Sequence, residues 1–319
     1  MSQSIISLQS PPSPDADTLV RRLHERLRTA AARRERSPGE CLEAGDDIQC
    51  DLLTVVEGRI LPGSAQKATL LELRPFVHLP GLYEGILRIP VFSAATVPLT
   101  LPPDYPVAGY AGASAHLYVE VRRAWAVDMP ALDDTQALKN AGLGSSPEEA
   151  MQRLADDLEA ELADELLLEA TQSVLDRVAA ETTVEGLAEK VEAELLRQWQ
   201  RGDGDFLAEK GFSSEIQASA RADFLADPGL RAQAERQIRI HAGLGARIER
   251  QQLQVAPDCA DDLLQQVADS MGLELSHLKK ALADDPVAAR EVAYTALYLT
   301  AVRQAVAEAR FEVVDPGHT

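Results

Sequence analysis

The sequence feature that most constrains the fold is a helix signal that begins at Ser146. Pro147 follows at the first helical position and Glu149 stands three residues after the serine, which together form a capping box. Apolar side chains then recur every four residues, at Leu154, Leu158, Leu162, Leu166, Ala170, Val174 and Val178. The pattern predicts one helix from Pro147 to about Ala180, roughly 50 Å long at ~1.5 Å per residue. A helix of this length with one apolar stripe favours an extended, crevice-bearing molecule over a compact ball.

The rest of the chain after Pro130 also reads as helical. Apolar periodicity predicts further helices at 184–200, 229–251, 258–271, 275–283 and 287–309. Gly243 and Gly245 lie within the predicted helix at 229–251, where we expect them to allow another helix to pack closely. No fixed repeat period is present, so the pattern argues against a solenoid. We therefore expect a helical domain at 130–312 and a short tail at 313–319.

Residues 41–129 have a different pattern, with short apolar runs separated by glycine and proline. The runs lie at 48–56, 68–73, 97–101 and 116–121, and a short helical turn is predicted near 81–87. Alternation with period two in several runs predicts a small, curved antiparallel sheet wrapped on a short helix. The chain as a whole is therefore predicted to be an α+β protein.

The first 40 residues combine a polar tail with a basic helix. Residues 1–14 are expected to form a disordered tail, with Ser13 as the N-cap of a helix and Pro14 at its first position. An Arg-rich linker helix is predicted within 15–40, and seven arginines lie between Arg21 and Arg36. Two interpretations stay open. The basic face docks on RNA or on the acidic rest of the chain, or it is simply a solvated helix surface.

The charge balance restricts the partners. The 319 residues include 31 basic and 51 acidic side chains, for a formal net charge of −20. Nucleic acid is disfavoured as the main partner, because phosphate neutralisation needs clustered Lys and Arg. The longest uncharged run, 89–103, contains four prolines and cannot form a membrane helix. The N-terminal residues lack the basic and long apolar regions of a signal peptide, so we expect a cytoplasmic protein without a membrane partner.

Residue spacing gives no support to a metal or cofactor site. The three cysteines, Cys41, Cys50 and Cys259, show no CxxC spacing and cannot all pair, which indicates a reducing compartment. The six histidines are scattered and form no HExxH motif. No Gly-x-Ser-x-Gly elbow is present. We therefore expect neither a metal nor a cofactor.

Three stretches carry a resemblance to a known family. They are Asp46 to Leu52, the block Leu79-Pro80-Gly81-Leu82-Tyr83-Glu84-Gly85-Ile86, and Leu101-Pro102-Pro103-Asp104-Tyr105. On these stretches, and on the passage from Met129 to Leu132 into the long helix, residues from about 15 to 312 resemble bacterial trigger factor without its ribosome-binding domain. The resemblance implies an FKBP-type peptidyl-prolyl isomerase domain at 41–129 and the family's chaperone domain at 130–312.

The prolyl pocket that this resemblance implies is altered. Where the family's pocket holds proline between aromatic rings and an aspartate, this sequence has Leu52, Leu61, Pro62, Thr69, Leu82, Val107 and Leu117. Tyr105 survives, and Leu79 opens the best-matching block. We call these nine residues the altered pocket.

The substitutions bear on catalysis. Rotation about a peptide bond crosses a barrier of ~18–20 kcal/mol, which a tightly shaped and desolvated pocket lowers. Flat rings hold a pyrrolidine in a specific geometry, whereas leucine and valine offer burial without that geometry. We therefore expect an inactive isomerase pocket. The altered pocket then either closes up as core or remains as a peptide groove.

The function that the resemblance implies is that of an ATP-independent chaperone or assembly factor for unfolded or assembling client proteins. The family's Gly-Phe-Arg-x-Gly-Lys ribosome-docking loop has no counterpart in this sequence, so we do not expect the ribosome as a partner. Two alternatives stay open: an active peptidyl-prolyl cis-trans isomerase, and a dedicated binding module for a single partner.

Overall fold

The structure, a computed structural model, describes residues 5–9, 15–75, 79–105 and 108–314. It is an α+β protein, as predicted, and forms two compact units. One, the sheet unit, consists of Pro14–Leu158 and Val191–Ala232. The other, the helical unit, consists of Met1–Ser13, Glu159–Lys190 and Gln233–Thr319.

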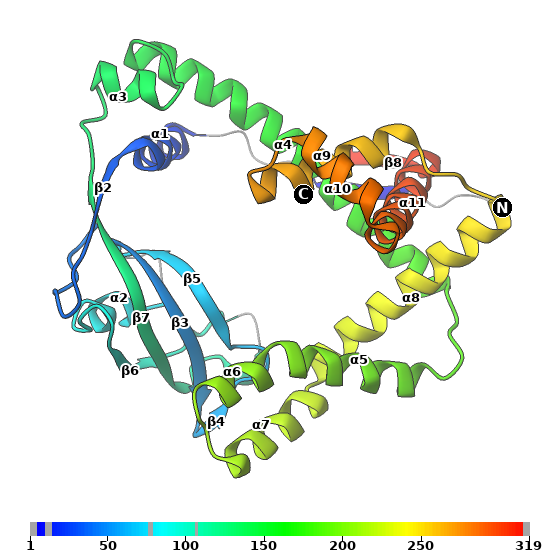
Figure 1. Cartoon of the computed structure of the whole chain (residues 1–319), viewed down its shortest axis with the longest axis horizontal. Helices are drawn as coiled ribbons and strands as arrows, with labels where there is room; N and C mark the ends of the chain where they lie inside the picture. The colour runs from blue at the N-terminus through cyan, green and yellow to red at the C-terminus, as the bar shows by residue number, and fades with distance from the viewer. Residues whose placement is uncertain (1–4, 10–14, 76–78, 106–107, 315–319) are drawn as a thin grey trace. The chain divides into compact units, whose positions relative to one another are not determined.

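The sheet unit is built on a curved antiparallel sheet (Figure 1). Its long strands are β3 (Asp47–Val56) and β7 (Ser114–Asp128), which pair with each other. β4 (Arg59–Ile60) and β5 (Gln66–Glu72) pair with β3, while β2 (Ala32–Glu35) and β6 (Ala94–Thr100) pair with β7. The sheet confirms the strand-rich pattern predicted for this part of the chain.

One face of the sheet encloses the main core of this unit. Ile48, Cys50 and Leu52 alternate along β3 and turn their side chains into it, as period two requires. The short helix α2 (Leu82–Ile86) supplies Leu82 and Ile86. Gly85 is required here, because a Cβ at this position would collide with the Val97 side chain of β6. The predicted sheet wrapped on a short helix is thus present.

The Arg-rich segment differs from the prediction. Helix α1 (Ala16–Ala30) begins at the N-cap Asp15, whose side chain accepts the Thr18 N–H, and Ser13 lies outside the described residues. The chain then leaves the helix and forms β2 along the edge of β7. Ion pairs explain the change: Arg28 and Arg33 both contact Asp47, at 2.6 and 3.1 Å. These two arginines are therefore held by a carboxylate of the same unit.

Further helices complete the sheet unit. They are α3 (Thr135–Asn140), the first part of α4 (Pro147–Glu181), most of α5 (Leu187–Arg201), α6 (Asp203–Glu209) and α7 (Ser214–Ala226). The Ser146 hydroxyl accepts the Glu149 N–H at 3.2 Å, as the capping box predicts, but the Glu149 carboxylate accepts the N–H of Ser145 instead of Ser146. Leu23 and Leu27 of α1 share a buried cluster with Leu154 of α4.

The helical unit contains the rest of α4, most of α8 (Pro228–Gln251), and α9 (Pro257–Met271), α10 (Leu275–Asp284) and α11 (Pro286–Glu308). These bounds lie within a few residues of the predicted helices. A Cβ at Gly243 would meet Thr182 and Val178 of the α4 region, which confirms the predicted close approach. Among the described residues, no helix is long and apolar enough to cross a membrane.

The two ends of the chain contain strands that were not predicted. β1 (Ile6–Gln9) lies within the expected disordered tail, yet it pairs in parallel with β8 (Phe311–Val314). Leu8 is buried at 3% exposure. Strand formation here depends on a partner about 300 residues away, so local composition contains no signal for it.

Candidate functional site

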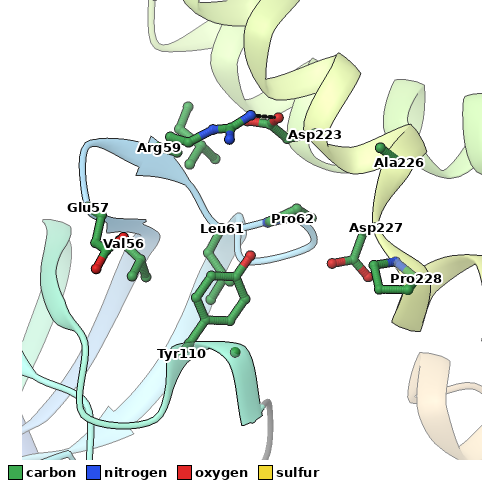
Figure 2. A pocket seen from close by; sticks show the side chains of 12 residues that line it. Val56, Glu57, Arg59, Leu61, Pro62, Tyr110, Asp223, Ala226, Asp227 and Pro228 are labelled. Carbon is green, nitrogen blue, oxygen red and sulfur yellow. Dashed lines mark hydrogen bonds and ion pairs between the residues drawn. The ribbon is translucent and has the colours of Figure 1, made fainter.

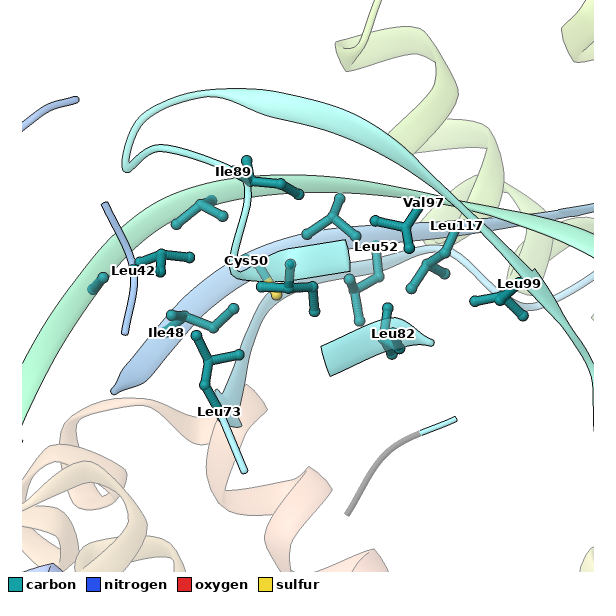
Figure 3. Close-up of a cluster of buried hydrophobic side chains, with 14 of the residues drawn as sticks. Leu42, Ile48, Cys50, Leu52, Leu73, Leu82, Ile89, Val97, Leu99 and Leu117 are labelled. Atoms are coloured by element: carbon teal, nitrogen blue, oxygen red, sulfur yellow. The ribbon is translucent and has the colours of Figure 1, made fainter. Parts of the chain in front are cut away.

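Six residues of the altered pocket converge in the structure. Leu52 of β3, Leu82 of α2 and Leu117 of β7 are 6–8% exposed and belong to one buried apolar cluster (Figure 3). Leu61, Leu79 and Tyr105 are half-buried and pack against that cluster. The sequence register therefore predicted residues that lie together in space.

Of the other three residues of the altered pocket, the two that the structure describes, Thr69 and Pro62, are not part of this cluster. Thr69 of β5 is half-buried and pairs with Cys50 across the sheet ladder. Pro62 is half-buried and lines a cavity described below. Val107 lies outside the described residues.

The cluster offers apolar burial and little reactivity. Its thiol, Cys50, is completely buried, and burial together with the charge of Asp51 raises the pKa of this thiol to about 12. A thiol with that pKa is protonated at neutral pH and is a poor nucleophile. At the centre, leucines stand where the resemblance places aromatic rings. The arrangement can bury an apolar group, but the leucines at its centre lack the flat shape that would grip a proline ring, and Tyr105 only packs against the cluster from outside its buried centre.

A cavity of about 450 Å³ lies at the rim of the altered pocket (Figure 2). Its walls come from the β3–β4 hairpin, from the turn at Tyr110, and from the end of α7 with the start of α8, all within the sheet unit. The lining residues are Val56, Glu57, Arg59, Ile60, Leu61, Pro62, Gly109, Tyr110, Asp223, Ala226, Asp227 and Pro228. The volume lies in the range of small-molecule and side-chain pockets.

The polar groups of this cavity are mostly acidic. Arg59 and Asp223 form an ion pair across it, and Figure 2 shows the Asp227 carboxylate facing the Tyr110 ring across the open space. The Asp227 carboxylate accepts the Leu230 N–H at 2.8 Å and so also caps α8. Burial and the nearby charges of Asp227 and Asp223 raise the pKa of the Tyr110 phenol. The phenol thus stays protonated at neutral pH.

The sequence pattern predicted only part of this cavity. Leu61 and Pro62 belong to the altered pocket, but Tyr110, Asp223 and Asp227 were not predicted. No local motif marks them, because more than 150 residues separate the two acids from the hairpin that they face. Among the described residues, no group of three or more potential metal-ligating side chains lies together.

Fold and site together define an α+β protein in which a small antiparallel sheet with an apolar, aromatic-poor pocket is joined to long helices. The chain is similar to trigger factors. It is 24% identical to the trigger factor of Hydrogenovibrio crunogenus over 262 residues, 80% of this chain and 56% of that protein. It is 25% identical to the trigger factor of Parvibaculum lavamentivorans over 229 residues, 71% of this chain and 43% of that protein. The predicted resemblance is confirmed.

The chain was also compared with protein-family models and with solved structures. No protein-family model matches the chain. A solved structure of the trigger factor chaperone shares 13% sequence identity with this chain at a TM-score of 0.38, over 95% of this chain and 70% of that one. The chain spans about half the length of the curated relatives that it matches.

Proposed function

We propose that this protein is an ATP-independent chaperone or assembly factor that holds unfolded or assembling client proteins. The similarity to trigger factors supports this class of function. The observation that carries the proposal is a set of large apolar side chains exposed on the helical unit. These are Leu167, Leu168, Met271, Leu273, Val287, Tyr294 and Leu299, each at least 38% exposed. Exposed apolar groups of this kind are suited to transient capture of unfolded segments.

The acidic composition is compatible with such a surface. A net charge of −20 makes copies of the chain repel one another, which opposes self-association through the exposed apolar side chains. We further propose that the protein acts in the cytoplasm and that its FKBP-like domain, at 41–129, is an inactive isomerase. The leucines at the centre of the altered pocket support the second point.

A second candidate, a binding module for a single partner, is favoured by the cavity at Leu61 and Pro62. The Arg59–Asp223 ion pair and the α8 cap at Asp227 hold the residues that line it, so the cavity has its shape before a partner binds. Capture of many unrelated proteins from the native cell supports the chaperone, whereas one stoichiometric partner supports this second candidate.

The full-length protein should suppress the aggregation of chemically unfolded rhodanese without nucleotide, as light scattering would record. Changing Leu167→Ser and Leu168→Ser together should weaken the suppression several-fold, since it removes about 1.5–3 kcal/mol of burial per leucine. The matched control is Leu70→Ser, which changes a leucine of the sheet unit that is 69% exposed. If the unchanged protein does not slow aggregation, the chaperone proposal is wrong.

Ribosomes should not co-sediment with the protein at physiological salt. The net charge of −20 repels ribosomal RNA phosphates. Arg28, Arg33, Arg34 and Arg36 are held in ion pairs with carboxylates of the same unit. Stoichiometric co-sedimentation would contradict this expectation. Its loss on Arg21→Glu and Arg22→Glu would then assign the binding to α1.

A further inference from the structure

Helix α6 covers the face of the sheet opposite the altered pocket. Asp51 and Leu53 alternate with Leu52 along β3, so their side chains point to this outer face. Both are nevertheless completely buried. Phe206 and Leu207 of α6 are buried as well, at 1% and 0% exposure. α6 and the sheet belong to the same compact unit (Figure 1).

Alternating charges join α6 to this outer face. Lys67 of β5 contacts Asp205 at 2.7 Å and also pairs with Glu209, and Arg122 of β7 contacts Glu209 at 3.2 Å. Lys210, directly after α6, contacts the buried Asp51 at 2.6 Å. We call this set the latch; its members are Asp51, Lys67, Glu120, Arg122, Asp205, Glu209 and Lys210.

Titration shifts agree with the latch geometry. The hydrogen bonds that Lys67 donates to Asp205 and Glu209 raise the pKa of Lys67 and lower the pKa of Glu209. Burial works to raise the pKa of Asp51, but hydrogen bonds from Lys210, the Ala68 N–H and Arg122 outweigh it and lower that pKa. Lys67, Glu209 and Asp51 are therefore charged at neutral pH, as their ion pairs require.

The first residue of α6 holds the loop next to the altered pocket. The Asp203 carboxylate, 2% exposed, accepts the N–H of Gly63 at 2.8 Å and that of Ala65 at 3.2 Å. This loop directly follows Leu61 and Pro62, which line the cavity. Gly63 has a φ of +73°, a conformation that favours glycine. The position of α6 therefore determines the position of the cavity rim.

Two features make this contact releasable. Asp205 and Glu209 are 61% and 48% exposed, so their ion pairs are weakened by water and screened by salt. α6 is also flanked by Gly202 and Gly211, at which the backbone can change direction. Opening would uncover Leu53, Phe206 and Leu207, which are apolar side chains that an unfolded segment can cover.

We propose that α6 is an electrostatic latch within the sheet unit. Closed, it shields Leu53 and fixes the loop of Gly63 and Ala65 at the rim of the altered pocket. Open, it frees that loop and presents an apolar surface to an unfolded client. The role of the open latch in client binding rests on the chaperone function proposed above, whereas the closed latch does not depend on that function.

Amide hydrogen exchange tests the closed latch in the full chain. Asp203→Ala should accelerate exchange at Gly63 and Ala65 by about 10- to 100-fold, because a charge-assisted acceptor is lost. Lys67→Met and Arg122→Met should accelerate the same two amides, although neither side chain touches them. Salt at about 1 M, where the Debye length is ~3 Å, should act in the same direction.

The matched control is Arg123→Met, the same substitution one residue further along β7. Arg123 pairs with Glu35 instead of α6, so exchange at Gly63 and Ala65 should stay at the wild-type rate. If Lys67→Met and Arg122→Met leave both amides at the wild-type rate, α6 does not act as a latch. The same conclusion follows if Arg123→Met accelerates them equally.

Client binding tests the open state. Reduced, carboxymethylated α-lactalbumin, which stays unfolded, should accelerate exchange at Gly63 and Ala65. The unfolded α-lactalbumin should also bind the Lys67→Met variant about 3- to 10-fold more tightly than it binds wild type, because a larger fraction of the variant molecules has the latch open. Equal affinity for both proteins would overturn the client half of the proposal. If neither wild type nor Lys67→Met binds the unfolded protein, both the proposed chaperone function and the proposed client binding by the open latch are wrong. The exchange rates of the variants still test whether α6 forms the closed latch.

Discussion

Arg36→Met should lower the free energy of unfolding of the sheet unit by about 3–5 kcal/mol, since it leaves a buried carboxylate without its cation. The Arg36 side chain is 4% exposed and contacts Asp46, 3% exposed, through two hydrogen bonds of 2.6 and 2.9 Å. Its remaining N–H groups reach Glu40 at 2.8 Å and Glu43 at 3.0 Å. The hydrogen bonds that Arg36 donates to Asp46 and Glu43 raise the pKa of Arg36, so it is always charged.

Urea unfolding followed by the fluorescence of Trp125 and Trp199 measures this effect, since both tryptophans belong to the sheet unit. The control is Arg34→Met, two residues earlier. Arg34 also pairs with Glu40, but its side chain is 62% exposed and water replaces the lost contact, so little change is expected. Equal destabilisation by the two variants would show that burial of the Arg36–Asp46 pair is not the cause.

A proline-containing tetrapeptide should isomerise no faster with the protein than without it, on the uncatalysed scale of tens to hundreds of seconds. The reason is the composition of the altered pocket. Leu52, Leu82 and Leu117 fill its centre as buried core, and Pro62 stands where the resemblance places the pocket aspartate. The centre of the altered pocket therefore lacks the aromatic rings, and position 62 lacks the aspartate, that the resemblance places around a prolyl amide.

Restoring one ring should not restore activity. Leu82→Phe adds bulk to a position that is 6% exposed, at a cost of roughly 1–3 kcal/mol in packing, and the neighbouring leucines still lack the required shape. A joint change of Leu52→Tyr, Pro62→Asp and Leu82→Phe is the smallest one expected to give measurable turnover. Turnover by the unchanged protein, blocked by a macrolide that fills FKBP-type pockets, would establish the isomerase alternative instead.

Local sequence signals predicted the elements whose own residues show a regular apolar period. The capping box at Ser146 and the four-residue apolar period that follows predicted a helix to about Ala180, and α4 ends at Glu181. Period-two alternation of apolar residues predicted β3 and β7. Successive side chains of a strand point to opposite faces of the sheet, so a strand that buries one face has an apolar residue at every second position. The resemblance, and not the alternation, named Leu52 and Leu117 as pocket residues, and both lie in the buried cluster.

Residues 31–36 show where local signals fail. Their arginines read as a continuation of the basic helix, but β2 forms because β7 offers an open edge and Asp46 and Asp47 offer carboxylates. β1 likewise needs β8, and the cavity needs Asp223 and Asp227 beside a hairpin far away in sequence.

The sequence by itself determined the class of fold and the long helix, because the apolar periods that mark helices and strands are read from neighbours a few residues apart. Only the tertiary structure decided which charges meet. Asp51 and Lys210 are 159 positions apart, and Asp203 lies 140 and 138 positions from the amides of Gly63 and Ala65. An ion pair or a capped loop depends on distances of about 3 Å, and folding of the whole unit sets such distances between segments that share no local pattern.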